Sequence, residues 1–365
     1  MSHAPDELLT RLLRDVSRSF YLTMRVLPAP VRPQISLAYL LARATDTIAD
    51  TEIVPVAQRL QALRELRERI LGQTRAPLNF TELARSQGKQ MLRHCDAAVR
   101  EIELSKITDP AHPENGSTAE RVLLERIEDV LGLCAGFAPD DQRRIRDVLD
   151  TITGGQALDL QRFGAARAGQ IVALQTELEL DDYTHRVAGC VGEFWTKMCR
   201  AHLFPRAPLD DAFLLANGVR FGQGLQYVNI LRDLPKDLRQ GRCYLPAEKL
   251  AAAGLTPADL LQPANEPRLR PLYDHYLDLA TEHLAAGWAY TSALPRAQIR
   301  VRLACAWPIL IGVQTLARLR HSNPLDATQR IKVSRAVVRQ IMLQSLLRYP
   351  FRTAWEGLWQ LARRS

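Results

Sequence analysis

The stretch that decides the fold of this chain is Tyr39–Asp50, YLLARATDTIAD. It carries two carboxylates, Asp46 and Asp50, four residues apart in an otherwise apolar run of helix-favouring residues. On an α-helix this spacing places both acids on one face, one turn apart. Because like charges at that spacing repel each other, we expect a positive group to lie between them.

A second stretch, residues 226–237, repeats this arrangement. Its polar residues are spaced 3, 4 and 4 positions apart and form one helical stripe: Gln226, Asn229, Asp233 and Asp237. The first stretch has a matching stripe, spaced 4, 3 and 4: Tyr39, Arg43, Asp46 and Asp50. If the two stripes face each other, they line a cavity with four carboxylates, two carboxamides and nearby basic groups.

Carboxylates concentrated in this way require cations. Hard oxygen ligands favour Mg²⁺, with Mn²⁺ as an alternative, over zinc or copper. Mg²⁺ binds through a few carboxylates, keeps several waters and takes further ligands from phosphate. Arg43 and Arg232 are suited to hold the phosphate oxygens. The residues therefore predict a metal-bridged diphosphate site in front of an apolar helical cavity.

Two simpler interpretations compete with this site. One acidic pair alone is usually a solvated helix face, but two matching pairs, each in an apolar helix with an arginine nearby, weaken that explanation. A di-iron carboxylate bundle needs Glu-x-x-His pairs on facing helices, and the sequence has none at these places.

The rest of the chain is patterned as helices. We expect breaks at the proline-rich residues 27–33 and at TDPAHPENGS, residues 108–117. The longer expected helices cover residues 6–26, 34–50, 55–73, 81–107, 118–132, 139–163, 211–237, 268–293, 296–320 and 327–347, with a further helix from Asp181. The sequence shows no period-two alternation, strand–helix–strand rhythm or internal repeat, so it predicts a single all-α domain.

Composition narrows the class of protein. The net charge of +8 suits anionic substrates or an anionic membrane surface, although it also occurs in proteins with no such role. The arginines are scattered, so we expect no nucleic-acid partner. The six cysteines form no CxxC pair, which indicates reduced, buried thiols. The N-terminus lacks the apolar core of a signal peptide, and no uninterrupted apolar run reaches about 18 residues, so we expect a cytoplasmic protein.

The C-terminal residues 337–365 mix arginine with tryptophan, phenylalanine and leucine, interrupted by Pro350. A basic amphipathic segment of this kind can lie on a membrane interface. The alternative is a C-terminal helix docked on the core. We leave both open, and with them peripheral contact with the inner face of the membrane.

Five motifs together resemble the squalene/phytoene synthase family, the head-to-head trans-prenyltransferases. They occur in family order over residues 8–320: SRSF at Ser17–Phe20, the DxxxD of Asp46–Asp50, GGQALDL near Asp159, YTHRVAGCVG from Tyr183, and NILRDLPKDLRQGRCYLP at Asn229–Pro246. The resemblance implies one all-α isoprenoid-synthase-type domain over residues 1–365, with a central cavity between two aspartate-rich helices. Residues 321–365 then form C-terminal helices outside the core.

The resemblance also implies roles for individual residues. Those similar to the family's Mg²⁺-bridging ligands are Asp46, Asp50, Asn229, Asp233 and Asp237. Those that match positions holding the diphosphate or the prenyl chain are Ser17, Arg18, Ser19, Tyr39, Arg43, Gln226 and Arg232. Tyr183 matches a tyrosine proposed as the acid/base. Tyr244 lies in the family's segment after the second acid motif, where it either contacts substrate or packs in the core.

The implied reaction is the magnesium-dependent condensation of two farnesyl diphosphates, through presqualene diphosphate, to squalene with NADPH as reductant. SRSFYLTMRVLP and the CAWP of Cys305–Pro308 resemble squalene synthases, whereas GGQALDL resembles phytoene synthases. The alternatives are therefore a phytoene, dehydrosqualene or hydroxysqualene synthase, with geranylgeranyl diphosphate as a possible substrate. An alternative from another class is a non-catalytic prenyl-diphosphate-binding protein.

Overall fold

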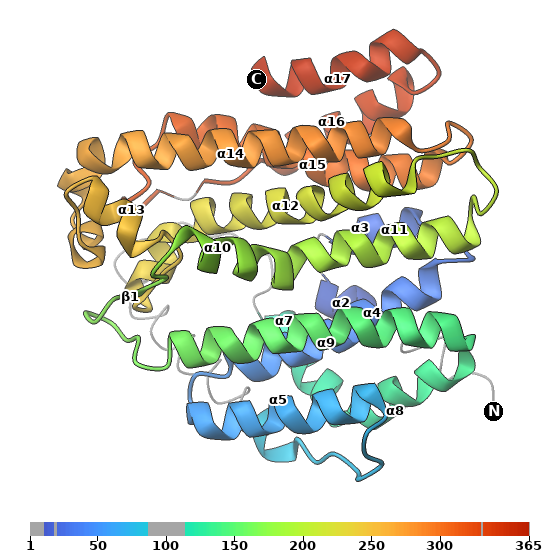
Figure 1. Ribbon diagram of the computed structural model, residues 1–365, viewed down its shortest axis with the longest axis horizontal. Coiled ribbons are helices and arrows are strands. Elements are labelled where there is room, and N and C mark those ends of the chain that lie inside the picture. The colour runs from blue at the N-terminus through green and yellow to red at the C-terminus, as the bar shows by residue number, and fades with distance from the viewer. Residues whose placement is uncertain (1–10, 18–19, 87–113, 330, 365) are drawn as a thin grey trace. The chain divides into compact units, whose positions relative to one another are not determined.

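A computed structural model of the chain describes residues 11–17, 20–86, 114–329 and 331–364 (Figure 1). Nearly all of its regular structure is helical, which confirms the all-α fold. The chain divides into two compact units, one of Met1–Arg25 with Val31–Gln161 and one of Val26–Pro30 with Arg162–Ser365. A single domain over residues 1–365 stays a prediction.

The first unit is built around helix α4 (Arg32–Asp50), which contains the Tyr39–Asp50 stretch. Its other helical elements are α2 (Leu13–Ser17), α3 (Phe20–Val26), α5 (Val56–Leu71), α7 (Glu114–Glu125), α8 (Ile127–Gly132), the 3₁₀ turn η2 (Leu133–Gly136) and α9 (Pro139–Arg162). Helix α4 contacts α2, α5, α7 and α8. Its apolar face, including Leu37, Ala44 and Ile48, is fully buried, so the core of this unit fixes the rotation of the helix.

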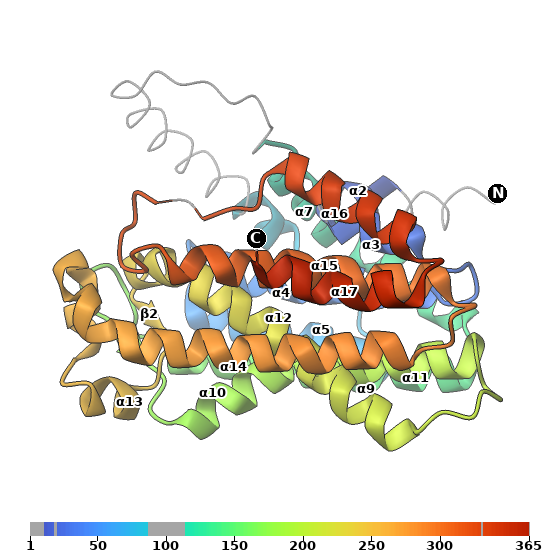
Figure 2. The same ribbon diagram turned by 90° about the horizontal axis from the view of Figure 1, so that it is seen from above.

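The second unit is built around α12 (Asp211–Arg239), which contains the other acidic stretch. Its remaining elements are β1 (Val172–Ala173), α10 (Glu177–Thr184), the π-helical turn η3 (His185–Gly189), α11 (Cys190–His202), β2 (Arg242–Cys243), α13 (Ala247–Ala252), the 3₁₀ turns η4 (Pro257–Leu261) and η5 (Pro263–Asn265), α14 (Glu266–Ala293), α15 (Ile299–Arg320), α16 (Arg335–Arg348) and α17 (Arg352–Arg364). Helices α12, α14 and α15 pack side by side, and α17 lies along α15 (Figures 1 and 2).

Glycines let α12 approach both α11 and the π-helical turn η3 very closely. A Cβ added at Gly192 would lie 1.8 Å from the carbonyl oxygen of Gly218, and one added at Gly222 would lie 2.1 Å from that of Ala188. Neither position can hold a larger side chain without moving a backbone. The tight helix packing expected from VAGCVG is therefore confirmed, with α12 as the partner helix.

A short parallel β-pair positions the chain after α12. Val172 pairs with Arg242 and Ala173 with Cys243. The turn before β2 uses Gly241, whose φ of 82° is a left-handed conformation that favours glycine. This pairing fixes the segment that follows, including Tyr244, which is 7% exposed.

Three helix starts differ from the sequence-based prediction. Helix α7 begins at Glu114, inside the loop expected at residues 108–117, and residues 87–113 lie outside the described chain. Helix α10 begins at Glu177 rather than at Asp181, because the side chain of Thr176 accepts a hydrogen bond from the backbone N–H of Glu179. Helix α16 begins at Arg335 rather than near residue 327, because Ser334 caps it through the N–H of Val337.

Helix α15 is long and apolar enough to cross a membrane by length and composition, the one such helix in the described ranges. Within its most apolar window, however, 72% is buried by the rest of the chain, as in a core helix. The cysteines in the described part of the chain are free, and four of them, Cys190, Cys199, Cys243 and Cys305, are buried. The expected burial of the thiols is confirmed for these four, and their reduced state stays a prediction.

Candidate functional site

The α4 stripe is organised by an arginine between two acids. Arg43 donates one N–H to Asp46, three residues along the same helix, and another to Glu120 on α7. The side chain of Glu120 is 8% exposed and that of Arg43 28%, so this ion pair is largely shielded from water. The sequence predicted a positive group between Asp46 and Asp50. Arg43 supplies positive charge to Asp46 from the preceding turn of the helix rather than from between the two acids.

The electrostatics of Asp46 favour cation binding. Burial, followed by the charge of Asp50 one turn away, raises the pKa of Asp46 to about 7, although Arg43 opposes the shift. Burial opposes the charge of Arg43, but the carboxylates of Asp46 and Glu120 prevail and raise its pKa. The Nε of Arg43 is buried and makes no hydrogen bond within the described residues. This stripe therefore has excess negative charge and one unsatisfied guanidinium donor.

The α12 stripe contains a second arginine–aspartate pair. The Nε and Nη2 of Arg232 donate to the two carboxylate oxygens of Asp233, at 2.8 and 2.6 Å. The two side chains are 34% and 38% exposed, so the pair remains accessible to a ligand. Asp237 follows one turn later and is half-buried. The side-chain amide of Asn229 donates to Gln226 at 3.4 Å, as the stripe predicts.

Tyr183 on α10 lies against the polar stripe of α12. Its hydroxyl accepts a hydrogen bond from Gln226 at 3.3 Å. Its ring stacks on that of Tyr244, with centroids 4.6 Å apart, and Tyr244 in turn meets the edge of Phe163 at 5.1 Å. Tyr244 is therefore both a buried packing residue and a neighbour of Tyr183. The resemblance left both roles open for Tyr244. The structure shows that the residue packs, and a contact with substrate stays a prediction.

The chain that carries these side chains matches the sequence model of one protein family over most of its length. The model of squalene/phytoene synthases matches residues 13–337, which include both acidic helices and Tyr183. The chain belongs to the squalene/phytoene synthase family. The resemblance drawn from the five motifs is thereby confirmed.

Relatives of both kinds within the squalene/phytoene synthase family are similar to this chain. A bifunctional lycopene cyclase/phytoene synthase of Gibberella fujikuroi is 29% identical over 74% of this chain and 40% of its own length. The squalene synthase of Schizosaccharomyces pombe is 24% identical over 92% of this chain and 64% of its own. The chain thus spans less than two thirds of either protein.

The same fold occurs in a solved squalene synthase structure. TcSQS in complex with the ligand BPH1237 superposes with a TM-score of 0.68 at 21% identity, covering 100% of this chain and 98% of that one. At this identity the match shows the fold alone. It agrees with the isoprenoid-synthase-type helical architecture expected from the sequence.

Of four other predicted residues of the family site, the structure describes two. Tyr39 is half-buried on α4 and close enough to Arg43 to raise its pKa. Ser17 is 4% exposed at the end of α2. Arg18 and Ser19 lie outside the described residues. Because the two acidic stripes belong to different units, their union in one cavity stays a prediction, and so do the roles of all the site residues.

Two residues of this site were missed by sequence reasoning. Glu120 is in no motif and lies 77 positions from Arg43, so only the packing of α7 on α4 reveals it. Phe163, three residues after the GGQALDL segment, appeared only as the limit of an expected helix. Its proximity to a motif was the one sequence feature that could have indicated its contact with Tyr244.

Magnesium binding by the acid pairs stays a prediction, and their oxygen donors are of the type that this ion uses. Across the described residues, no three or more His, Cys, Asp or Glu side chains are arranged to hold a metal ion. Each helix instead offers two carboxylates one turn apart, beside an arginine. Mg²⁺ takes one or two carboxylates and completes its shell with water and substrate phosphate. Asp46 with Asp50, and Asp233 with Asp237 and Asn229, could hold it in that way.

Proposed function

We propose that this protein is a squalene synthase that condenses two farnesyl diphosphates head to head through presqualene diphosphate. The observation that carries the proposal is a shared local geometry. On both α4 and α12 an arginine pairs with the first aspartate of an Asp-x-x-x-Asp motif. The chain belongs to a family of prenyltransferase type, and this membership supports the proposed class of reaction. Two arginine–acid pairs suit a substrate with two phosphates and its counter-ions.

The first chemical step is ionisation of an allylic diphosphate. Magnesium supplies positive charge that stabilises diphosphate as a leaving group. Arg43 and Arg232 each carry a carboxylate partner that phosphate oxygens can replace, because both groups accept from the same guanidinium donors. The C–O bond breaks with its electron pair leaving on diphosphate. The arginines thus hold the leaving group where the charge develops.

The allylic cation is then captured by carbon. The double bond of the second farnesyl diphosphate supplies the electron pair, and loss of a proton closes the cyclopropane ring. We assign that proton to Tyr183, and the hydrogen bond between its hydroxyl and Gln226 beside the acidic stripe supports the assignment. The stacked rings of Tyr183 and Tyr244 present π faces that can stabilise a cation and exclude water.

The fate of presqualene diphosphate decides the final product. A second ionisation and hydride transfer from NADPH give squalene, whereas proton loss gives dehydrosqualene. SRSFYLTMRVLP and the CAWP at Cys305–Pro308 favour squalene. The second candidate is a phytoene synthase using geranylgeranyl diphosphate. It is favoured by GGQALDL and by phytoene-synthase relatives at 29% identity.

The test is product analysis with pure protein. We expect farnesyl diphosphate and Mg²⁺ to give presqualene diphosphate without NADPH and squalene with it. Dehydrosqualene or hydroxysqualene under both conditions would overturn the squalene assignment. Turnover of geranylgeranyl diphosphate alone would establish the phytoene candidate.

Variants separate an enzyme from a protein that only binds prenyl diphosphates. Asp46→Asn and Asp233→Asn should each nearly abolish diphosphate release, and the double variant should lose little more, because groups that act together are strongly non-additive. Asp140→Asn and Asp278→Asn, exposed acids paired with Arg143 and Arg320, serve as controls and should be active. No turnover by the unaltered protein, with binding unaffected by these changes, would favour the binding protein.

A further inference from the structure

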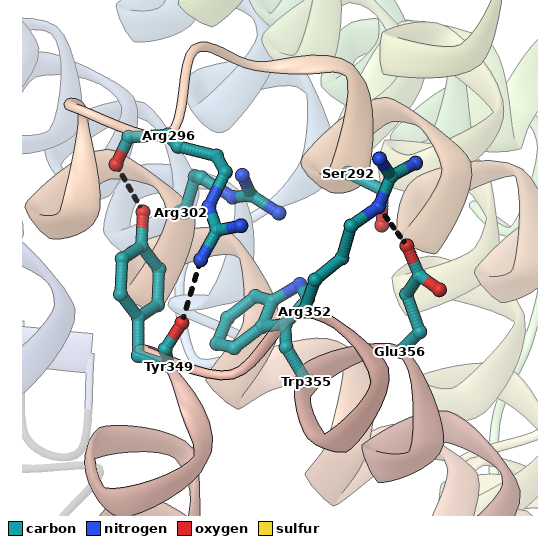
Figure 3. A pocket seen from close by; sticks show the side chains of 7 residues that line it. All are labelled: Ser292, Arg296, Arg302, Tyr349, Arg352, Trp355 and Glu356. Atoms are coloured by element: carbon teal, nitrogen blue, oxygen red, sulfur yellow. Dashed lines mark hydrogen bonds and ion pairs between the residues drawn. The ribbon is translucent and has the colours of Figure 1, made fainter.

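A second basic cavity lies in the C-terminal part of the second unit, apart from every residue assigned to catalysis. It has a volume of about 290 Å³ and lies where the start of α17 meets the α14–α15 connection (Figure 3). Its lining includes Arg296, Arg302, Tyr349, Arg352, Trp355 and Glu356. Three guanidinium groups and one carboxylate therefore surround one small space.

Arg302 is the group that most requires explanation. It is 5% exposed, and its Nε is buried without a hydrogen bond to the described residues. Its guanidinium lies over the rings of Trp355 and Tyr349, 5.2 and 5.5 Å from their centroids, and one Nη donates weakly to the carbonyl of Leu294 at 3.4 Å. Burial and the charge of Arg296 lower the pKa of Arg302. A buried cation in this state favours an anionic partner.

The cavity contains no protein group that neutralises this charge. Glu356 is paired with Arg352, at 2.9 Å from its Nε. In the described part of the chain, neither Arg296 nor Arg302 has a carboxylate at ion-pair distance. Arg296 instead donates to the backbone carbonyls of Pro350 and Tyr349, at 3.0 and 3.4 Å. The net charge of the lining is positive, which is complementary to a phosphate group.

The stretch of sequence next to the cavity-lining residues carries exposed apolar side chains. Leu343, Leu346 and Leu347 share one face of α16 by their helical spacing and are 57%, 48% and 64% exposed. Phe351, 66% exposed, lies in the turn between the cavity-lining residues Tyr349 and Arg352. Water-exposed leucines and a phenylalanine next to arginines form the composition of a membrane-interface segment.

We propose that the α16–α17 segment docks on an anionic phospholipid bilayer, with a lipid phosphate seated between Arg296, Arg302 and Arg352 and the apolar side chains of α16 inserted beside it. The charge of the cavity accounts for the phosphate, and the exposed apolar residues favour a lipid over a soluble phosphate. A long-chain hydrocarbon product would enter the bilayer, but the docking does not depend on which product is made.

The test is cosedimentation of the full chain with vesicles. We expect binding to phosphatidylcholine vesicles containing about one third phosphatidylglycerol and little binding to phosphatidylcholine alone. The double variant Arg296→Gln/Arg352→Gln should weaken binding roughly 25-fold, about fivefold for each arginine. Both residues are on the surface, so the variant should fold, and an unchanged thermal transition would verify this.

Matched controls distinguish the segment from general charge and hydrophobicity. Arg75→Gln/Arg206→Gln removes two exposed arginines outside both the cavity lining and the α16–α17 segment, and should leave binding within about twofold. Leu347→Ser should weaken binding, whereas Leu178→Ser, at a position 81% exposed on α10, should not. Equal losses in test and control variants would overturn the proposal. So would binding of inorganic phosphate that requires Arg296 and Arg352 without any binding to vesicles.

Discussion

Glu120 on α7 and Arg43 on α4 form an ion pair that links two helices of the first unit. Arg43 is also paired with Asp46, so the guanidinium is held between one structural acid and one acid of the proposed metal site. Glu120 is almost fully buried, and we assign it a positioning role: it fixes Arg43 without touching substrate.

We expect Glu120→Gln to lower the rate of diphosphate release about 10- to 100-fold, the usual effect of losing a group that orients a ligand-binding residue. The KM for farnesyl diphosphate should change less than kcat. The control is Glu125→Gln on the same helix, where the acid is 41% exposed and paired with the exposed Arg121. Equal kcat in the two variants would remove the positioning role.

The hydroxyl groups of Tyr183 and Tyr244 should contribute differently to catalysis. Tyr183→Phe keeps the ring stack but removes the hydroxyl bonded to Gln226, so we expect a 10²-fold or greater loss of cyclopropane formation, about the contribution of an acid/base group. Tyr244→Phe keeps the stack and should retain nearly full activity. Single-turnover measurement of presqualene diphosphate separates the two, and similar losses in both would assign them one common packing role.

Removal of divalent metal should stop the first ionisation. With excess chelator we expect no diphosphate release from farnesyl diphosphate, and recovery on addition of Mg²⁺ or Mn²⁺. Binding of the unreactive thio-diphosphate analogue should weaken in parallel, because the acidic stripes then repel the diphosphate. Full turnover in chelator would contradict the assignment of both acid pairs as metal ligands.

Because α11 packs closely on α12, we expect a larger side chain between these helices to destabilise the protein. Gly192→Ala places a methyl group 1.8 Å from the carbonyl oxygen of Gly218, so the free energy of unfolding should fall by about 1–3 kcal/mol. Gly357→Ala on α17 meets nothing within 4 Å and should be neutral or stabilising, since alanine is the better helix former. Denaturant titration of both variants measures the free energy of unfolding and checks the two predictions.

A pH dependence is expected from Glu128 on α8. Partial burial opposes its ionisation, but hydrogen bonds from Arg69 and from the backbone N–H of Leu78 prevail and lower its pKa below the ordinary 4.5. A carboxylate with a lowered folded-state pKa stabilises the fold above its unfolded pKa, and that contribution is lost as pH falls through the folded value. Glu128→Gln should therefore destabilise the protein at pH 7, and the difference should shrink below about pH 4. A constant difference would contradict the linkage.

The local elements could be predicted from the sequence because their causes are local. The apolar periodicity around Asp46 and Asp233 predicted α4 and α12 nearly to their ends, and the glycines of VAGCVG predicted close packing. The first residues of helices were predicted less accurately than the helices themselves. The starts of α10 and α16 depend on single capping hydroxyls, Thr176 and Ser334, within polar segments that offer several candidate caps.

By itself the sequence determined the chemistry available to this protein: two acid pairs at helical spacing, each with an arginine, and the motifs that identify the family. Only the tertiary structure decided which distant groups complete each stripe. Glu120 reaches Arg43 because α7 packs on α4, Tyr244 stacks on Tyr183 because the β-pair returns the chain, and Arg302 is buried under Trp355 because α17 folds back on α15. Spacing along a helix fixes neighbours within about one turn, whereas contacts between helices depend on how whole apolar faces pack.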